Sequence, residues 1–413
     1  MDYLKEYPDL KKLLKIFSEI SGKRVLIFSH DDPDGLTAGA ILEKILEKSG
    51  ARVQMVLLPT YELSRQELLD NYQQQDLVII ADKGTIGYYD DYLEIVSNLI
   101  IIDHHPPQNG QIKKALVFNP AVKEYQQTAT AHLANIIAEQ LGLVDEQIDF
   151  LTLVGLKGDW AIEPATDFVA PFVTEFYNRV AGKFPKMLAR IKDRPTMFEV
   201  RQRENTTVLN QIGEFFFALS GGGFQYFYNE RISELKNVSQ VDFAYKLLRS
   251  CPGKDYGSFA EFRQTIPEKD LAEKIYQCYR QDWEKVSHLF DFVVTIGKKE
   301  ETECYLFVGR NVPLMPMVGS VKLAELGEDG VALIMVNQEK NGGLHFSFRG
   351  KGNKLHLGKL ASELAENLIE RYGQRGVISG GGHPVAAECK TRTAGVNFSD
   401  GLRIFLNLFD KKQ

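Results

Sequence analysis

Short runs of branched aliphatic residues alternate with helical patterns through the first 165 residues, and this alternation constrains the fold more than any other feature. The runs cover residues 25–28, 53–58, 77–81, 99–102 and 115–118, and a helical pattern over 36–48 follows the first of them. Strands that are apolar at every position are buried on both faces, as in parallel sheets covered by helices. The sequence therefore predicts an α/β fold built from βαβ units around a mostly parallel sheet.

Two changes of pattern further along the chain predict three domains. Runs of β-branched residues disappear between about 166 and 290, where helices are expected over 242–249 and 259–286. Strands return at 292–296, 304–308, 331–336 and 344–348, and helices are expected over 357–372 and near 402–408. We therefore expect a parallel-sheet domain over 1–165, a helical insert or linker over 166–290, and a smaller mixed α/β domain over 291–413.

Composition restricts the classes of protein to which the chain can belong. Hydrophobic residues make up 44% of the chain and charged residues 25%, and there is no apolar run of 18 residues, so we expect a globular protein without a membrane span. The N-terminus lacks the plan of a signal peptide and the four cysteines are widely spaced, which predicts a cytoplasmic location. The formal net charge of -6 argues against indiscriminate binding of long duplex DNA.

Imidazoles and carboxylates follow three of the predicted strands and one apolar helical run. They are His30, Asp31, Asp32 and Asp34 after the first strand, Asp82 after the third, Asp103, His104 and His105 after the fourth, and Asp159 after the helical run. One such group alone would indicate a solvated turn, but four groups in one α/β domain predict a dinuclear metal site at the carboxyl ends of the strands. Mixed histidine and carboxylate ligands suit Mn²⁺, with Mg²⁺, Co²⁺ or Zn²⁺ as alternatives. Asp31 is expected to be a solvated neighbour and not a ligand.

This series of motifs resembles the motif set of the DHH phosphoesterase superfamily, which includes RecJ exonucleases and oligoribonucleases. The C-terminal region adds Gly380, Gly381, Gly382 and His383, which resemble the glycine-glycine-glycine-histidine signature of the DHH-associated C-terminal domain. The resemblance covers both ends of the chain, and the helical middle contributes no motif to it. His30 lies two residues before Asp32, whereas many relatives carry the histidine at the position of Phe28, and the shorter spacing resembles the archaeal-type RecJ-like branch.

The resemblance implies a role for each of these residues. It implies that one metal ion is held by His30, Asp32 and Asp82 and a second by Asp34, Asp82, His104 and Asp159, with Asp82 bridging the two. Asp103 would orient a ligating histidine, and His105 would face the scissile phosphate. Two Mn²⁺ ions would be the cofactors, with Mg²⁺ or Co²⁺ as alternatives.

The C-terminal motif implies a substrate-binding domain that faces the metals across an interdomain cleft. Gly380 to Gly382 would form a glycine loop whose backbone N–H groups approach a phosphate, and a plain tight turn is the alternative. His383 would add a hydrogen bond. Arg349, at the end of a predicted strand, would grip a second phosphate or else remain solvated.

Other histidines and glycines have simpler interpretations. His345 and His356 are expected to be core or surface residues, and His132 is expected either near the site or at a helix cap. The apolar run that ends at Gly221, Gly222, Gly223 and Phe224 predicts the C-terminus of a helix, with a phosphate-binding nest as the alternative.

The favoured function is a Mn²⁺-dependent phosphodiesterase or exonuclease that hydrolyses single-stranded or short nucleic acid with a metal-activated water. A phosphoesterase for cyclic dinucleotides or nucleotide bisphosphates is the first alternative, and a non-catalytic replication scaffold is the second. Pyrophosphatase is disfavoured because that branch lacks the glycine-rich motif. The expected partners are single-stranded DNA or RNA, short oligonucleotides and, as further options, a second copy of the chain and replication or repair proteins.

Overall fold

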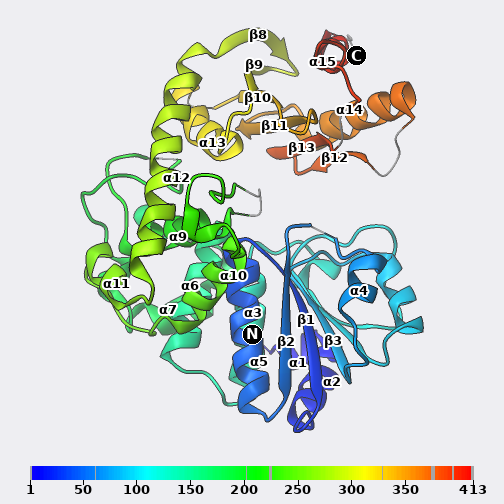
Figure 1. Cartoon of the computed structure of the whole chain (residues 1–413), viewed down its shortest axis with the longest axis vertical. Coiled ribbons are helices and arrows are strands. Elements are labelled where there is room, and N and C mark those ends of the chain that lie inside the picture. Colours follow the sequence, from blue (N-terminus) through cyan, green and yellow to red (C-terminus); the bar gives the residue numbers. More distant parts are fainter. Residues whose placement is uncertain are drawn as a thin grey trace. The chain divides into compact units, whose positions relative to one another are not determined.

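The computed structural model describes residues 2–60, 62–200, 202–222, 226–327, 329–373, 377–392 and 395–410. Two compact units share these residues (Figure 1). The first unit contains residues up to 196 together with 204–277, and the second contains residues 197–203 together with those from 278 onwards. Each unit has a sheet of its own. None of the helices in the described part of the chain is long and apolar enough to cross a bilayer.

The first unit is built on a five-stranded sheet in which every strand runs parallel to its neighbours. The strand order is β2-β1-β3-β4-β5. The strands are β1 (Arg24–His30), β2 (Arg52–Leu58), β3 (Leu77–Ala81), β4 (Leu99–Ile102) and β5 (Leu116–Phe118). The α/β parallel-sheet prediction is therefore confirmed, and each strand lies within about a residue or two of its predicted range.

The register of this sheet aligns the ends of four strands. Ser29 pairs with Ala81, Ala81 with Ile102, and Ile102 with Phe118. The residues that come next along each strand are His30, Asp82, Asp103 and Asn119. One row of polar side chains therefore crosses the carboxyl edge of the sheet, which is where open α/β sheets place their sites.

Helices cover both faces of this sheet. On one face, α3 (Pro33–Lys48) packs on β1 and β2, and α5 (Thr130–Gln140) and α6 (Glu146–Gly158) pack beside it. On the other face, α4 (Arg65–Asn71) and the 3₁₀ helix η1 (Gly87–Glu94) contribute Leu68 and Tyr89 to a buried apolar cluster with Phe28 and Ile80. Two further helices, α1 (Tyr3–Glu6) and α2 (Pro8–Ser18), precede β1.

Helix α3 begins earlier than the sequence predicted because Asp32 caps it. The Asp32 side chain accepts a hydrogen bond from the backbone N–H of Gly35, and Pro33 occupies the first helical turn. A Cβ on Gly35 would lie 2.5 Å from the carbonyl oxygen of His30. The glycine therefore serves a close approach of the helix to the end of β1.

Most of the helical segment after residue 166 belongs to the first unit. Two short paired strands lie at its start, β6 (Ile162–Glu163) and β7 (Phe168–Val169). Its helices are α7 (Thr174–Ala181), α8 (Pro185–Leu188), α9 (Val208–Ser220), α10 (Gln240–Ser250), α11 (Phe259–Thr265) and α12 (Lys269–Leu289). α9 packs on α6, and α10 packs on α3. The boundaries near 165 and 290 remain predictions.

The end of α9 and the break between α11 and α12 test two predictions made from the sequence. α9 ends at Gly221, which has a left-handed φ of 79°, so the predicted helix C-terminus is present. Gly223 and Phe224 lie outside the described residues. The single helix predicted over 259–286 is wrong, because α11 and α12 are separated at Pro267 and at Glu268, whose φ is 49°.

The second unit is a six-stranded mixed sheet with the order β12-β13-β11-β10-β9-β8. Only β9 and β10 are parallel, and the other neighbours are antiparallel. The elements are β8 (Val294–Lys299), β9 (Thr302–Arg310), α13 (Met315–Leu326), β10 (Val331–Gln338), β11 (Leu344–Lys351), α14 (Leu357–Tyr372), β12 (Ile378–Gly382), β13 (Ala386–Thr391) and α15 (Phe398–Asp410). The predicted separate mixed α/β domain is confirmed in its architecture.

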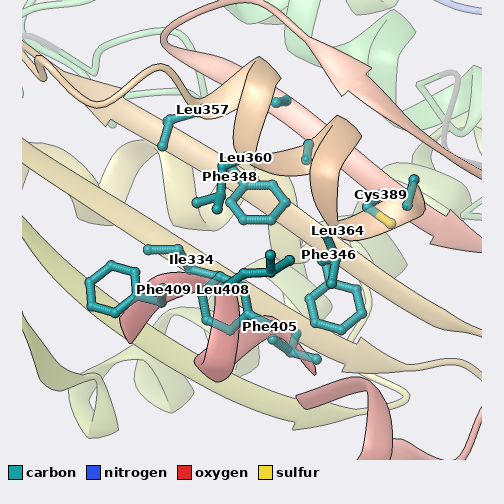
Figure 2. Packing of buried hydrophobic residues seen from close by; sticks show 14 of the residues in the cluster. Ile334, Phe346, Phe348, Leu357, Leu360, Leu364, Cys389, Phe405, Leu408 and Phe409 are labelled. Carbon is teal, nitrogen blue, oxygen red and sulfur yellow. The ribbon is translucent and has the colours of Figure 1, made fainter. Parts of the chain in front are cut away.

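One face of this sheet carries the core of the second unit. Figure 2 shows Phe346 and Phe348 of β11 between Leu360 and Leu364 of α14 and Phe405 of α15. All five side chains are buried. α13 packs against β10 and β11, and a Cβ on its Gly319 would lie 2.1 Å from the sulfur of Met335.

Candidate metal centre

The six residues predicted as metal ligands lie together at the carboxyl edge of the parallel sheet. They are His30 at the end of β1, Asp32 and Asp34 at the start of α3, Asp82 after β3, His104 after β4 and Asp159 at the end of α6. Three groups bring one ligand atom per residue within 4.8 Å of one another: His30 with Asp32 and Asp82; Asp34 with His104 and Asp159; and Asp82 with His104 and His105. Asp82 and His104 each belong to two groups, so the groups form one continuous cluster.

The geometry around His104 fits a bound cation better than a hydrogen-bond network. Its Nε2 atom lies 2.7 Å from Asp159 Oδ2, 3.5 Å from Asp82 Oδ1 and 3.8 Å from Asp34 Oδ2. Both His104 Nε2 and Asp159 Oδ2 are buried without a well-formed hydrogen bond to any residue that the structure describes. Buried polar atoms that converge without bonding to each other require a further partner at their common point. A divalent cation has the charge and the ligand preference to be that partner.

Helix α5 holds two of these carboxylates from outside the cluster. The backbone N–H of Thr130 donates to Asp34 Oδ2 at 2.6 Å, and that of Ala131 donates to Asp34 Oδ1 at 2.9 Å. The Thr130 hydroxyl donates to Asp82 Oδ1 at 3.0 Å. The first turn of a helix favours negative charge, so this arrangement orients Asp34 and partly offsets its burial.

The pKa values record an excess of negative charge. Burial raises the pKa of Asp34 well above its usual value, and the charges of Asp82 and Asp159 raise it further. Burial and Asp32 raise the pKa of Asp82. Burial lowers the pKa of His30, but the charge and the hydrogen bond of Asp32, together with the charges of Asp31 and Asp82, outweigh burial and raise that pKa to about 9. A bound cation would stabilise the ionised form of these carboxyl groups.

The backbone is strained at two points of the cluster. Asp82 has a φ of 55°, and Trp160, directly after Asp159, has a φ of 58°. Residues other than glycine rarely adopt this left-handed conformation, and it is concentrated at functional sites. The backbone N–H of Asp82 donates to the carbonyl of Ile102 at 3.0 Å, which pins the chain where it leaves β3.

Asp103 and His105 form a second layer beside the cluster. Asp103 is fully buried, and its Oδ1 lies 2.9 Å from His105 Nδ1. The Thr85 hydroxyl donates to Asp103 Oδ2 at 2.8 Å, and the Asn119 amide donates to the same oxygen at 3.3 Å and to the His105 carbonyl at 2.8 Å. Thr85 and Asn119 therefore fix the carboxylate that contacts His105.

Sequence reasoning missed Asn119, Thr85 and Thr130. A signal for Asn119 was present, because it follows the strand 115–118 as Asp82 follows 77–81. Thr85 and Thr130 carry no such signal, since hydroxyl residues near strand ends and helix starts are common for local reasons.

The expectation that Asp31 is solvated is wrong. Its side chain is fully buried, and burial raises its pKa to about 6. The adjacent β3 end contributes a second buried charge, Lys83, whose ammonium donates to the carbonyl of Thr60 and whose pKa burial lowers to about 8. His132 does not cap its helix: it lies inside α5, its Nδ1 lies 2.9 Å from the Thr128 hydroxyl, and burial lowers its pKa to about 3.

The residues predicted to bind substrate all belong to the second unit. Arg349 lies within β11 and not at its end. Its Nε donates to the Ser320 hydroxyl at 3.2 Å, and its terminal nitrogen lies 3.6 Å from Glu388. Glu388 also contacts Lys390 at 2.9 Å and His345 at 3.2 Å. A phosphate bound by Arg349 would therefore compete with a carboxylate already in contact.

The predicted glycine loop is a strand. Gly380, Gly381 and Gly382 form the end of β12, which pairs only with β13 among the described strands and lies at an edge of the sheet. A Cβ on Gly380 would lie 2.3 Å from the carbonyl oxygen of Ala361, so this glycine allows α14 to approach the strand. Gly382 has a φ of 135°, where side chains are strained.

The turn after β12 contacts the start of α14 through backbone hydrogen bonds. The backbone carbonyls of Pro384 and His383 accept hydrogen bonds from the first N–H groups of α14, Leu357 and Gly358. His356 is the N-cap residue of α14, and His345 is buried in β11. The His383 side chain is exposed. A cavity of about 320 Å³ borders Gly382 and Ser362 in the same region.

Alanine substitutions are expected to separate the structural from the functional glycines of β12. Gly380→Ala should destabilise the second unit by about 1–3 kcal/mol because the new methyl group would overlap the α14 backbone. Gly381→Ala should leave stability unchanged, since its Cβ would meet only Ser362 Oγ at 3.6 Å. Thermal unfolding measures both effects. If the two variants unfold alike, the packing role of Gly380 is wrong; a loss of hydrolysis in Gly381→Ala at full stability would indicate ligand contact.

A known family model matches the part of the chain that carries five of the six candidate ligands, and Asp159 lies just beyond it. Residues 24–155 match the model of the DHH family, N-terminal domain. An uncharacterised protein of Methanocaldococcus jannaschii is 28% identical over 174 residues, which cover 40% of this chain. The match spans only 39% of that relative's length.

Comparison with solved structures shows a RecJ-like fold. A manganese-bound exonuclease RecJ is 18% identical with a TM-score of 0.61, covering 98% of this chain and 95% of the other. RecJ from Thermus thermophilus in complex with Mn²⁺ is 16% identical with a TM-score of 0.63, covering 98% of this chain and 55% of the other. CDC45 from Entamoeba histolytica is 12% identical with a TM-score of 0.51, covering 98% of this chain and 99% of the other.

Proposed function

The chain has a DHH family N-terminal domain and a RecJ-like fold, and we propose that it is a metal-dependent phosphodiesterase that acts on single-stranded or short nucleic acid. The observation that carries this proposal is the continuous cluster of metal-competent groups joined by Asp82 and His104. Two structural neighbours are RecJ structures bound to manganese, and they support the proposed metal dependence.

The ligand sets of this proposal are the ones that the sequence resemblance implies. In the proposal, His30, Asp32 and Asp82 hold one Mn²⁺, and Asp34, Asp82, His104 and Asp159 hold a second. Two such ions would supply a water of lowered pKa and neutralise charge on the phosphate. Thr130 and Ala131 orient Asp34, and Asp103 orients His105 toward the phosphate.

The second unit supplies substrate binding in this proposal. Arg349, Gly380, Gly381, Gly382 and His383 contact phosphate or a terminal nucleotide. The full ligand set argues against a purely non-catalytic scaffold. Buried carboxylates without a cation destabilise the fold, and a scaffold that binds no metal would gain nothing from them. A cytoplasmic location, a homodimer and replication or repair partners stay predictions from the sequence.

Digestion of end-labelled DNA and RNA ladders, from dinucleotides upward, tests the proposal. We expect shortening in Mn²⁺, weaker shortening in Mg²⁺ and none in excess chelator, because the ligands are oxygen and imidazole groups that need a divalent cation. A cyclic dinucleotide in parallel distinguishes the alternative phosphoesterase. Full activity in excess chelator, or inertness toward every nucleic acid in Mn²⁺, would contradict the proposed function.

A further inference from the structure

Asp31 is a buried carboxylate without hydrogen-bond donors beside the candidate metal centre. Its side chain is fully buried, and neither carboxylate oxygen receives a hydrogen bond from another residue in the described part of the chain. Asp149 offers a contrast: it is equally buried but lies 3.2 Å from Arg179 and 2.8 Å from Lys183. A buried polar group without partners is rare and calls for a reason other than stability.

The imidazole of His30 is the ionisable group that contacts Asp31. Asp31 Oδ1 lies 3.8 Å from His30 Nε2, while His30 Nδ1 lies 3.0 Å from Asp32 Oδ2. The ring therefore stands with Nδ1 toward the metal-competent group and Nε2 toward Asp31. A neutral imidazole carries one proton, so an Nδ1 lone pair directed at a cation requires the proton on Nε2.

Two other roles for Asp31 do not fit the geometry. Asp31 belongs to none of the metal-competent groups found among the described residues, so it is not placed as a ligand. Lys83 does not pair with it directly. The Lys83 ammonium contacts the carbonyls of Leu58 and Thr60, and no carboxylate of the described chain lies within 4.0 Å of it.

We propose that Asp31 is a positioning residue whose buried negative charge, 3.8 Å from His30 Nε2, favours the proton of His30 on that nitrogen, so that the Nδ1 lone pair faces Asp32 and Asp82. The inference rests on the proposed metal-dependent function. Histidines that ligate metals usually donate their other N–H to a carboxylate, which fixes the tautomer and the ring orientation. Asp103 and His105 form a shorter carboxylate–imidazole contact in this site, of 2.9 Å and through Nδ1.

Metal binding and stability, measured on the same variants, test this role. Titration calorimetry with Mn²⁺ should show that Asp31→Ala weakens one of two ions about 10- to 100-fold. The unfolding midpoint of metal-free Asp31→Ala should equal or exceed that of the wild type, because the substitution removes an unpaired buried charge. Asp149→Asn is the matched control: it should lower the midpoint and leave both affinities unchanged.

The tautomer provides a readout independent of activity. In ¹⁵N-histidine-labelled protein with Mg²⁺, the His30 signals, assigned by their loss in His30→Asn, should show the proton on Nε2, and Asp31→Ala should lose this preference. A proton on Nδ1 in the wild type would overturn the inference. So would unchanged affinity for both ions in Asp31→Ala, which would leave the proposed function standing. If the wild type binds no Mn²⁺, the proposed function itself fails.

Discussion

Asp82→Ala is expected to lower kcat/KM for nucleic-acid hydrolysis by about a thousandfold or more, since metal clamping contributes several kcal/mol to lowering the barrier. Asp82 Oδ1 lies 3.5 Å from His104 Nε2 and 3.8 Å from His105 Nδ1, and Asp82 also groups with His30 and Asp32. Among the described residues, no other carboxylate is shared between groups on both sides of the cluster. Its loss should therefore lower the occupancy of both ions, which elemental analysis would measure.

The left-handed backbone at Asp82 calls for a second variant. Alanine is strained at a φ of 55°, whereas asparagine tolerates this conformation. Asp82→Asn should retain the fold by circular dichroism and still lose most activity. Asp31→Ala serves as the comparison, because at saturating Mn²⁺ it should lose less than about tenfold. Equal losses in Asp31→Ala and Asp82→Asn, with folding intact, would contradict the ligand assignment.

The candidate site was largely predictable because its residues stand at strand ends. A run such as 99–102 followed by Asp103, His104 and His105 reveals both the strand and the polar edge. What the sequence could not show is the strand order. Only the adjacency of β1, β3 and β4, and a register that aligns Ser29 with Ala81, bring the separate motifs into one row.

Two of the wrong expectations have a common physical origin in tertiary packing. Asp31 was expected in solvent, but the side chain is fully buried. Gly380 to Gly382 were expected in a loop from their resemblance to the glycine-glycine-glycine-histidine signature, and glycine is depleted in strands. The close approach of α14 at Ala361 requires a residue without a Cβ, and this requirement overrides local propensity.

The residues that support the ligands were the least predictable part of the site. Thr130 reaches Asp82 from a helix 48 residues further along the chain, and Asn119 reaches the Thr85–Asp103 pair from β5. Single hydroxyl and amide residues occur at many helix starts and turns, so their types reveal nothing without the contacts. Prediction from sequence therefore identified the metal-competent residues but not the residues that orient them.

Asp103→Asn is expected to lower kcat by about a hundredfold or more while both ions stay bound, as loss of an orienting carboxylate does in other histidine-dependent enzymes. Burial would raise the pKa of Asp103, but the charges of His105 and His104 and the hydrogen bonds from His105 and Thr85 together outweigh burial and hold that pKa below its usual value. The carboxylate therefore stays ionised and accepts a hydrogen bond from the N–H at His105 Nδ1. An amide of the same shape presents an N–H instead, which favours the opposite tautomer and disorients the ring that we propose faces the phosphate.

Thr85→Val provides the matched control for this pair. It removes the 2.8 Å hydrogen bond to Asp103 but keeps the carboxylate, so the loss should be about tenfold, equivalent to about 1.4 kcal/mol, within the range for one hydrogen bond. Steady-state kinetics with elemental analysis of metal content separates the outcomes. Loss of an ion in Asp103→Asn would make Asp103 a ligand, and unchanged kcat would show that His105 needs no orientation. A hundredfold fall in kcat with two ions retained is the result that assigns Asp103 to the positioning of His105.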